Sequence, residues 1–210
     1  MKDAYIAAKE RWARKMAGQA KPTVRSTDRL PPGQRQVHDF PVLDLGVHPD
    51  VPLDQWTLTL DGLVENPVTL DWTSFLALPQ FKDRSDLHCV TTWSQFDMPW
   101  EGVAFFTLAD LIHIKPEATH AFFQGYDGYT TNTSLDQLMD DDVLIAHSWN
   151  GKPLTKEHGA PARVIIPKQF AWKGAKFVRL ITFRDQDKLG FWETRGYSNT
   201  ADPWTEDRFA

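Results

Sequence analysis

Short apolar strands separated by turn residues occur through most of this 210-residue chain. Residues 55–62 alternate polar and apolar side chains and end at Asp61-Gly62, which predicts a half-buried strand followed by a turn. Similar patterns predict strands at residues 64–70, 86–92, 121–124, 143–148, 163–167 and 176–183. Asp71, Thr107 and Ser134 are expected to cap short helices that end before Pro79, at Ile114 and at Met139. Because strands outnumber helices and the two mix irregularly, the sequence predicts an α+β fold with antiparallel or mixed sheets.

The first 39 residues differ in character from the rest of the chain. Residues 3–17 predict a short basic helix, and residues 21–36 are basic and polar around Pro31-Pro32-Gly33. We expect an extended arm on the surface here, with a mobile tail as the alternative. The prediction is an N-terminal helix and arm over residues 1–39 and a single domain over residues 40–210.

Charge and composition exclude several classes of protein. The net charge of −5 argues against a general nucleic-acid binder. No stretch approaches the roughly 18 consecutive apolar residues that a membrane-spanning helix needs. Residues 1–21 lack the apolar segment of a secretory signal, so we expect a cytoplasmic protein. The nine tryptophans are many for this length, and they could fill a core or wall a cofactor pocket.

Cys89 is the only cysteine in the chain. A lone cysteine cannot form an internal disulfide or a site built from several thiolates. Its remaining roles are a small buried apolar residue, a nucleophile, or a single thiolate ligand to a soft metal centre. All three stay open from the residue type alone.

A second group of polar residues lies between residues 154 and 176. His158 stands in a loop, Arg163 begins an apolar strand, and Gly174 could bring its backbone N–H close to an anion beside Lys176. Together these residues could hold a phosphate by charge-assisted hydrogen bonds. The alternative is that they are solvated basic residues beside a core strand.

Two long motifs resemble the molybdopterin-binding domain of the sulfite oxidase family. One is His88-Cys89-Val90-Thr91-Thr92-Trp93-Ser94 followed by Trp100-Glu101-Gly102-Val103. The other is residues 158–167 followed by Trp172-Lys173-Gly174-Ala175-Lys176. The resemblance covers about residues 40–204 and is closest to short bacterial stand-alone members, which neighbour the methionine-sulfoxide reductase catalytic subunits. It implies an oxidoreductase built on a single mixed-sheet α+β domain of the sulfite oxidase molybdopterin-binding type.

The resemblance implies molybdenum-molybdopterin as the cofactor and a role for each matching residue. Cys89 matches the cysteine whose thiolate binds molybdenum, and a thiolate is a soft donor suited to that task. The positions matching pterin contacts are Leu43, Asp44, Asp127, His158, Arg163, Gly174, Ala175 and Lys176. His88 could tune the thiolate or be a core residue, and Tyr126 could place its hydroxyl near the metal or serve packing.

The loop at residues 40–46 departs from the sulfite oxidase pattern. Leu43 stands where that family has an arginine that binds the substrate anion, and Asp44 and Leu45 replace an asparagine and a histidine. A sulfite dianion would lose a positive partner and gain a negative one. We therefore expect two-electron oxo transfer on a small neutral S-oxide or N-oxide, with an unidentified protein as electron partner. Trp93, Trp100 and Tyr126 are expected to wall the substrate site.

Two alternatives remain open on sequence alone. The chain could be a non-catalytic molybdopterin-binding or interaction protein on the same fold. It could also be a thiol redox sensor that uses Cys89. Metal analysis together with dye-linked turnover separates the first alternative from an enzyme, and peroxide sensitivity of metal-free protein tests the second.

Overall fold

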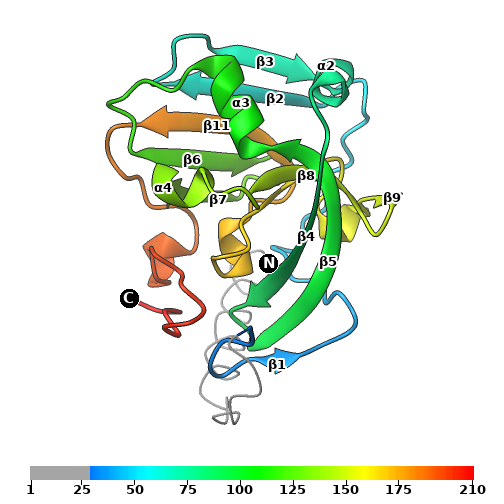
Figure 1. The fold of residues 1–210 in the computed structure, drawn as a ribbon, viewed down its shortest axis with the longest axis vertical. Helices are drawn as coiled ribbons and strands as arrows, with labels where there is room; N and C mark the ends of the chain where they lie inside the picture. Colours follow the sequence, from blue (N-terminus) through cyan, green and yellow to red (C-terminus); the bar gives the residue numbers. More distant parts are fainter. Residues whose placement is uncertain (1–28) are drawn as a thin grey trace.

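The computed structural model describes residues 29–210, so the predicted helix at residues 3–17 lies outside the described part of the chain. Two sheets make up the fold (Figure 1). The five-stranded sheet has the order β3-β2-β11-β6-β7, and the six-stranded sheet is built around β5. The β1–β5 and β2–β11 pairs are parallel and the other pairs are antiparallel. The predicted α+β fold with mixed sheets is therefore confirmed.

The strands occupy the following residues. The five-stranded sheet contains β2 (Thr57–Gly62), β3 (Val68–Asp71), β6 (His120–Gly125), β7 (Thr130–Ser134) and β11 (Val178–Arg184). The six-stranded sheet contains β1 (Arg35–Gln36), β4 (Phe81–Cys89), β5 (Trp93–Ala104), β8 (Leu144–Trp149), β9 (Lys152–Pro153) and β10 (Arg163–Ile165). In Figure 1, β4 and β5 curve away from the five-stranded sheet toward β1.

The helices are short. The α-helices are α2 (Trp72–Ala77), α3 (Phe105–Ile112) and α4 (Leu135–Leu138), and the 3₁₀ turns are η1 (Lys156–His158), η2 (Ala171–Lys173) and η3 (Glu193–Arg195). Asp71 caps α2 as predicted, because its carboxylate accepts the Ser74 N–H at 2.7 Å. Ser134 precedes α4 but forms no side-chain cap hydrogen bond.

The predicted start of α3 at Thr107 is wrong. The helix begins at Phe105, directly after β5, with Ala104 in the cap position. The Phe105 N–H donates to the Val143 carbonyl at 2.9 Å, so a neighbouring segment holds this helix start in place of a capping side chain.

The sequence patterns missed β5 and β7. β5 carries Pro99 and a register shift at Glu101/Gly102, which break the alternation that predicts a strand. Glycine at position 102 allows close packing there, because a Cβ would lie 2.1 Å from the Ile145 carbonyl oxygen. β7 consists only of threonine, asparagine and serine residues and so carries no apolar periodicity. β4, predicted over residues 86–92, instead begins at Phe81 and ends at Cys89.

Buried apolar side chains form two clusters. The larger one contains residues of both sheets and of the helices, among them Phe75, Phe123 and Ile145. The smaller one surrounds the end of β4 and includes Cys89 and Trp93. Within residues 29–210, no helix combines the length and the apolar character needed to cross a membrane.

Candidate active site

The tight turn between β4 and β5 fixes the position of the Cys89 sulfur. Cys89 ends β4 and pairs with Trp93 across the turn, and the Thr92 N–H donates to the Cys89 carbonyl at 3.0 Å. The Thr91 Oγ1 lies 3.2 Å from the Cys89 Sγ. The N-terminal arm braces this turn, because the Gln34 Nε2 donates to the Cys89 carbonyl at 3.1 Å.

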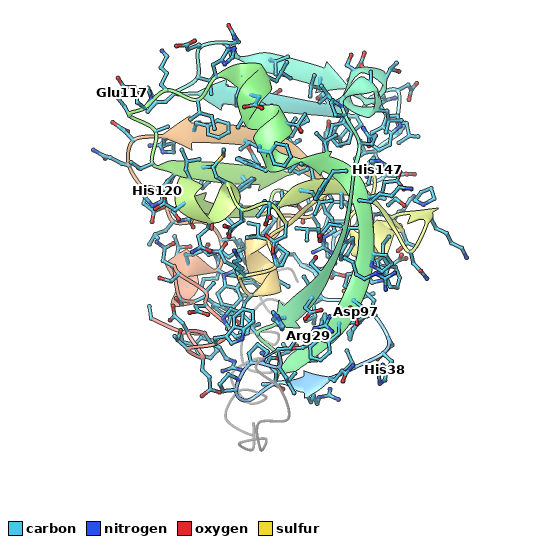
Figure 2. All side chains as sticks on the ribbon, viewed as in Figure 1. Arg29, His38, Asp97, Glu117, His120 and His147 are labelled. Atoms are coloured by element: carbon cyan, nitrogen blue, oxygen red, sulfur yellow. The ribbon has the colours of Figure 1, made fainter. Side chains whose placement is uncertain are left out.

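Ion pairs hold the same arm to β4 and β5. Arg29 donates to both Asp86 and Asp97, with 2.8 Å between its Nη2 and the Asp97 Oδ1, and the labelled side chains meet there in Figure 2. Solvent and salt screen these pairs, because Arg29 lies at the surface.

Burial sets the chemical state of Cys89. The side chain is 5% exposed, and burial raises the pKa of the thiol, while the hydrogen bond from Thr91 and the positive charge of Lys176 lower it by smaller amounts. Reactive sensor cysteines are typically exposed thiolates with a lowered pKa. A bound metal deprotonates a coordinating thiol regardless of its free pKa. The surroundings of Cys89 therefore favour a metal ligand over a redox sensor.

The Cys89 side chain opens into a cavity of about 130 Å³. On the same measure one water needs about 10–15 Å³, so the cavity admits a much larger molecule. It is walled by the loop after the arm, the cysteine turn, and segments that follow β6, β10 and β11. The lining residues are Phe40, Pro41, Leu43, Asp44, Leu45, Leu87, Cys89, Val90, Thr91, Trp93, Asp127, Tyr129, Arg163, Ala171, Trp172, Gly174, Lys176, Trp192 and Tyr197.

Arg163 is a buried positive charge at this cavity. Its side chain comes from β10, is 3% exposed, and donates from Nη1 to the His158 carbonyl at 3.2 Å. Burial lowers the pKa of the guanidinium to about 10, so it remains charged at neutral pH. Its Nε has no hydrogen-bond partner among residues 29–210. A buried cation of this kind favours an anionic group in the cavity.

The unpartnered donors fit the cofactor that the family resemblance implies. Besides the Arg163 Nε, the buried Nε1 atoms of Trp93 and Trp172 have no acceptor within the described residues. Indole and guanidinium nitrogens are donors only, so they suit an acceptor-rich anion such as a pterin phosphate. The soft sulfur of Cys89 at the cavity suits the metal. Cys89, Arg163, Trp93 and Trp172 together therefore match molybdenum-molybdopterin.

Five further residues expected at the cofactor site also line the cavity: Leu43, Asp44, Asp127, Gly174 and Lys176. The Lys176 ammonium donates to the Glu157 carbonyl at 2.5 Å, and the Asp127 carboxylate accepts the Tyr129 N–H at 3.0 Å.

Gly174 has a role different from the expected one. Its N–H donates to the Ala171 carbonyl, and a Cβ would lie 2.5 Å from the Val164 carbonyl oxygen. Glycine at this position therefore permits close packing on β10.

The structure does not bring Tyr126 and His88 to the cavity. The Tyr126 hydroxyl accepts the Thr57 N–H at 2.8 Å on β2. His88 points to the opposite face of β4 from Cys89, because successive residues of a strand alternate. Its Nδ1 lies 2.8 Å from the Ser94 Oγ, and its ring packs against Trp204.

Three other residues lie just behind the cavity wall. The His158 ring stacks on Phe40 with 3.9 Å between the centroids, and its Nδ1 is buried without a hydrogen-bond partner within residues 29–210. Ala175 is fully buried, and its carbonyl accepts the Val164 N–H. Trp100, expected as a wall of the substrate site, packs edge-on against Phe40 and does not line the cavity.

Sequence reasoning missed part of the cavity wall. Trp172, Trp192 and Tyr197 form a ring cluster there, with centroids 5.4 Å apart for Trp172–Tyr197 and 4.9 Å apart for Trp192–Tyr197. The high tryptophan count was the one signal for such a wall, and it did not say which tryptophans take part.

Acidification from pH 7 to pH 4 is expected to destabilise the cofactor-free fold through His158. Burial, followed by the charges of Arg163 and Lys176, lowers the pKa of this imidazole to about 4. The unfolded chain takes up a proton near pH 6.5 and the folded chain does not, so stability is lost as the pH falls from about 6.5 to about 4. The loss should be about 1–2 kcal/mol after solvent screening is allowed for.

Urea unfolding at pH 7, 5.5 and 4 measures this effect. His158→Phe keeps an aromatic ring against Phe40 and should show a smaller loss of unfolding free energy than the wild type. The exposed His38, substituted by glutamine, is the control and should behave as the wild type does. An equal pH dependence in His158→Phe and wild type would contradict the assignment.

Comparison with known proteins identifies the family. The model of the oxidoreductase molybdopterin binding domain matches residues 45–192. The uncharacterized oxidoreductase YuiH of Bacillus subtilis is 40% identical over 185 residues, covering 86% of this chain and 92% of its own. The protein-methionine-sulfoxide reductase catalytic subunit MsrP of Gluconobacter oxydans is 30% identical over 155 residues, and the match spans 65% of this chain and about half of MsrP, 49%.

A solved structure agrees in fold. The sulfane dehydrogenase SoxCD from Paracoccus pantotrophus superposes with a TM-score of 0.61 at 24% identity, over 66% of this chain and 40% of that one. Together with the cavity around Cys89 and Arg163, the family match leads to one conclusion: this chain belongs to the oxidoreductases with a molybdopterin-binding domain.

Proposed function

We propose that the cavity holds the molybdenum cofactor with Cys89 as the protein ligand to the metal, and that the enzyme removes an oxygen atom from a small neutral S-oxide or N-oxide or adds one to the corresponding reduced compound. The observation that carries this proposal is that a buried soft sulfur and a buried guanidinium with an unpartnered Nε share one cavity. When bound, the cofactor supplies the two-electron redox change and the oxygen-atom transfer.

Each protein residue in the proposal has a defined task. Arg163 binds the phosphate of the pterin by charge-assisted hydrogen bonds, and Lys176 adds positive charge on the same side. The indole N–H groups of Trp93 and Trp172 donate to pterin acceptors. The Thr91 hydroxyl orients the Cys89 sulfur, and the apolar wall excludes water from it.

The loop at the cavity favours an uncharged substrate. Leu43 contributes no charge, and Asp44 contributes a carboxylate that accepts the Gly46 N–H at 2.7 Å and lies 2.7 Å from the His48 Nε2. A negative group at a partly desolvated cavity raises the energy of a sulfite dianion more than that of a neutral oxide. The name of the MsrP relatives, methionine-sulfoxide reductase, supports an S-oxide as the substrate class.

Substrate preference is the prediction that follows. With artificial electron dyes at fixed ionic strength, kcat/KM should be higher for at least one neutral S-oxide or N-oxide than for sulfite. Leu43→Arg should raise the affinity for sulfite, and Leu43→Met is the control that keeps an apolar side chain of similar volume. Sulfite turnover above that of every neutral oxide would contradict the proposal. Molybdenum in the protein without turnover of any substrate would favour the non-catalytic alternative.

The electron partner and the location belong to the same proposal. We expect a separate carrier protein to exchange single electrons with the enzyme, and we expect the enzyme in the cytoplasm, which agrees with its single reduced thiol. Fractionation of native cells tests the location, and co-purification under reducing conditions tests the partner.

A further inference from the structure

Two short turns carry the aromatic wall of the cavity. Trp172 belongs to η2 and Trp192 directly precedes η3, and each turn has only three residues and no side-chain cap. A single 3₁₀ turn has little stability of its own. Tertiary contacts must therefore fix where both indole rings stand. In Figure 1 the two turns are the short gold and orange-red helices below the five-stranded sheet.

A fully buried ion pair joins the two turns behind the rings. Lys173 follows Trp172 in the chain, and Glu193 follows Trp192. The Lys173 Nζ lies 2.9 Å from the Glu193 Oε1. The two side chains are 0% and 1% exposed. On the cavity side, Tyr197 contacts both Trp172 and Trp192. Ring contacts therefore hold the wall on the cavity side, and the buried ion pair holds it on the opposite side.

The ion pair is anchored to β7 of the five-stranded sheet. The Lys173 ammonium also donates to the Asn132 carbonyl at 2.9 Å, and the Thr131 hydroxyl donates to the Glu193 Oε1 at 2.9 Å. Asn199 adds an acceptor 3.4 Å from the Lys173 Nζ. These hydrogen bonds thus fix both turns relative to β7 as well as to each other.

The stability of the fold does not by itself account for the buried ion pair. Burial lowers the pKa of Lys173, which reports a desolvation penalty that Glu193 only partly offsets. Apolar residues of similar volume often replace a buried ion pair with no loss of stability. What they cannot replace is a set of directional bonds that permits one arrangement of the two turns.

We propose that Lys173 and Glu193 are positioning residues that hold the Trp172–Trp192 wall in the geometry that retains the pterin. This inference rests on the proposed cofactor cavity. Neither residue lines that cavity, so the pair acts through the neighbouring tryptophans.

The test compares pterin retention with fold stability. The double variant Lys173→Met/Glu193→Leu replaces both charges by apolar side chains and leaves no unpaired buried charge. Wild type and variant are purified with bound cofactor, dialysed, and assayed over time for pterin by the fluorescence of its oxidised form. Thermal unfolding of the cofactor-free forms is followed by circular dichroism. The exposed pair Lys168–Asp140, substituted as Lys168→Met/Asp140→Leu, is the matched control.

We expect the double variant to unfold at nearly the wild-type temperature and to lose pterin about tenfold faster or more, as is usual when a residue supporting such a site is removed. The control should retain pterin as the wild type does. A folded double variant that retains pterin like the wild type would overturn the inference. If the double variant fails to fold, Thr131→Val decides: faster pterin loss supports the inference and unchanged loss overturns it. A wild type that binds no pterin would instead overturn the proposed function.

Discussion

Cys89→Ser is expected to abolish turnover and to remove the paramagnetic molybdenum signal of the wild type. Serine keeps nearly the volume of cysteine but offers a hard oxygen that is not ionised at neutral pH, whereas the soft thiolate suits the metal. The substitution leaves the turn intact, because the bonds that hold it come from the Cys89 backbone carbonyl. The unfolding free energy of the cofactor-free protein should therefore change little.

Electron paramagnetic resonance, metal content and dye-linked activity measure this effect on the same preparations. Thr91→Val is the companion variant, since it removes the hydroxyl 3.2 Å from the sulfur and leaves the sulfur in place. It should retain the metal and shift its signal. A Cys89→Ser protein with wild-type signal and turnover would remove Cys89 from the metal site.

Arg163→Met is expected to act in opposite directions on the loaded and the cofactor-free protein. With cofactor, the loss of a charge-assisted hydrogen bond should cost about 1.5–3 kcal/mol, or a tenfold or greater loss of pterin affinity. Without cofactor, the substitution removes a buried charge whose Nε has no partner within residues 29–210, so the fold should be as stable as the wild type or more stable.

Equilibrium unfolding and pterin content together measure the two effects. Arg163→Ala should lose pterin as well, but the space it leaves also costs stability, so methionine is the cleaner test. Arg163→Lys keeps the charge but not the planar fork and should retain an intermediate amount of pterin. The exposed Arg179→Met is the control. Full pterin loading in Arg163→Met would mean that the phosphate binds elsewhere.

The sequence predicted the elements that depend on interactions between residues close together in the chain. The alternation before Gly62 predicted β2, and the carboxylate of Asp71 predicted the start of α2. Asn150-Gly151 connects β8 and β9 as a tight turn with both residues at positive φ, as this dipeptide favours. β5 escaped prediction because it is held by pairing with β1, β4 and β8 rather than by its own periodicity.

The residues of the candidate site also fall into those that the sequence predicts and those that depend on tertiary packing. Cys89 and Arg163 could be predicted because their motifs are contiguous, and both line the cavity. Tyr126 was misplaced because sequence proximity to Asp127 does not fix the direction of a side chain, and its hydroxyl bonds to β2 instead. Trp192 and Tyr197 could not be predicted, since only tertiary packing brings their segment beside η2.

The central claim is that Cys89 holds molybdenum-molybdopterin in this cavity. The most direct test is the molybdenum and pterin content per mole of the full chain, purified in parallel as wild type and Cys89→Ser from a host that makes the cofactor. We expect near-stoichiometric molybdenum and pterin in the wild type, and a loss of molybdenum in Cys89→Ser. A wild type that contains neither, or a Cys89→Ser protein that keeps full molybdenum, would contradict the account.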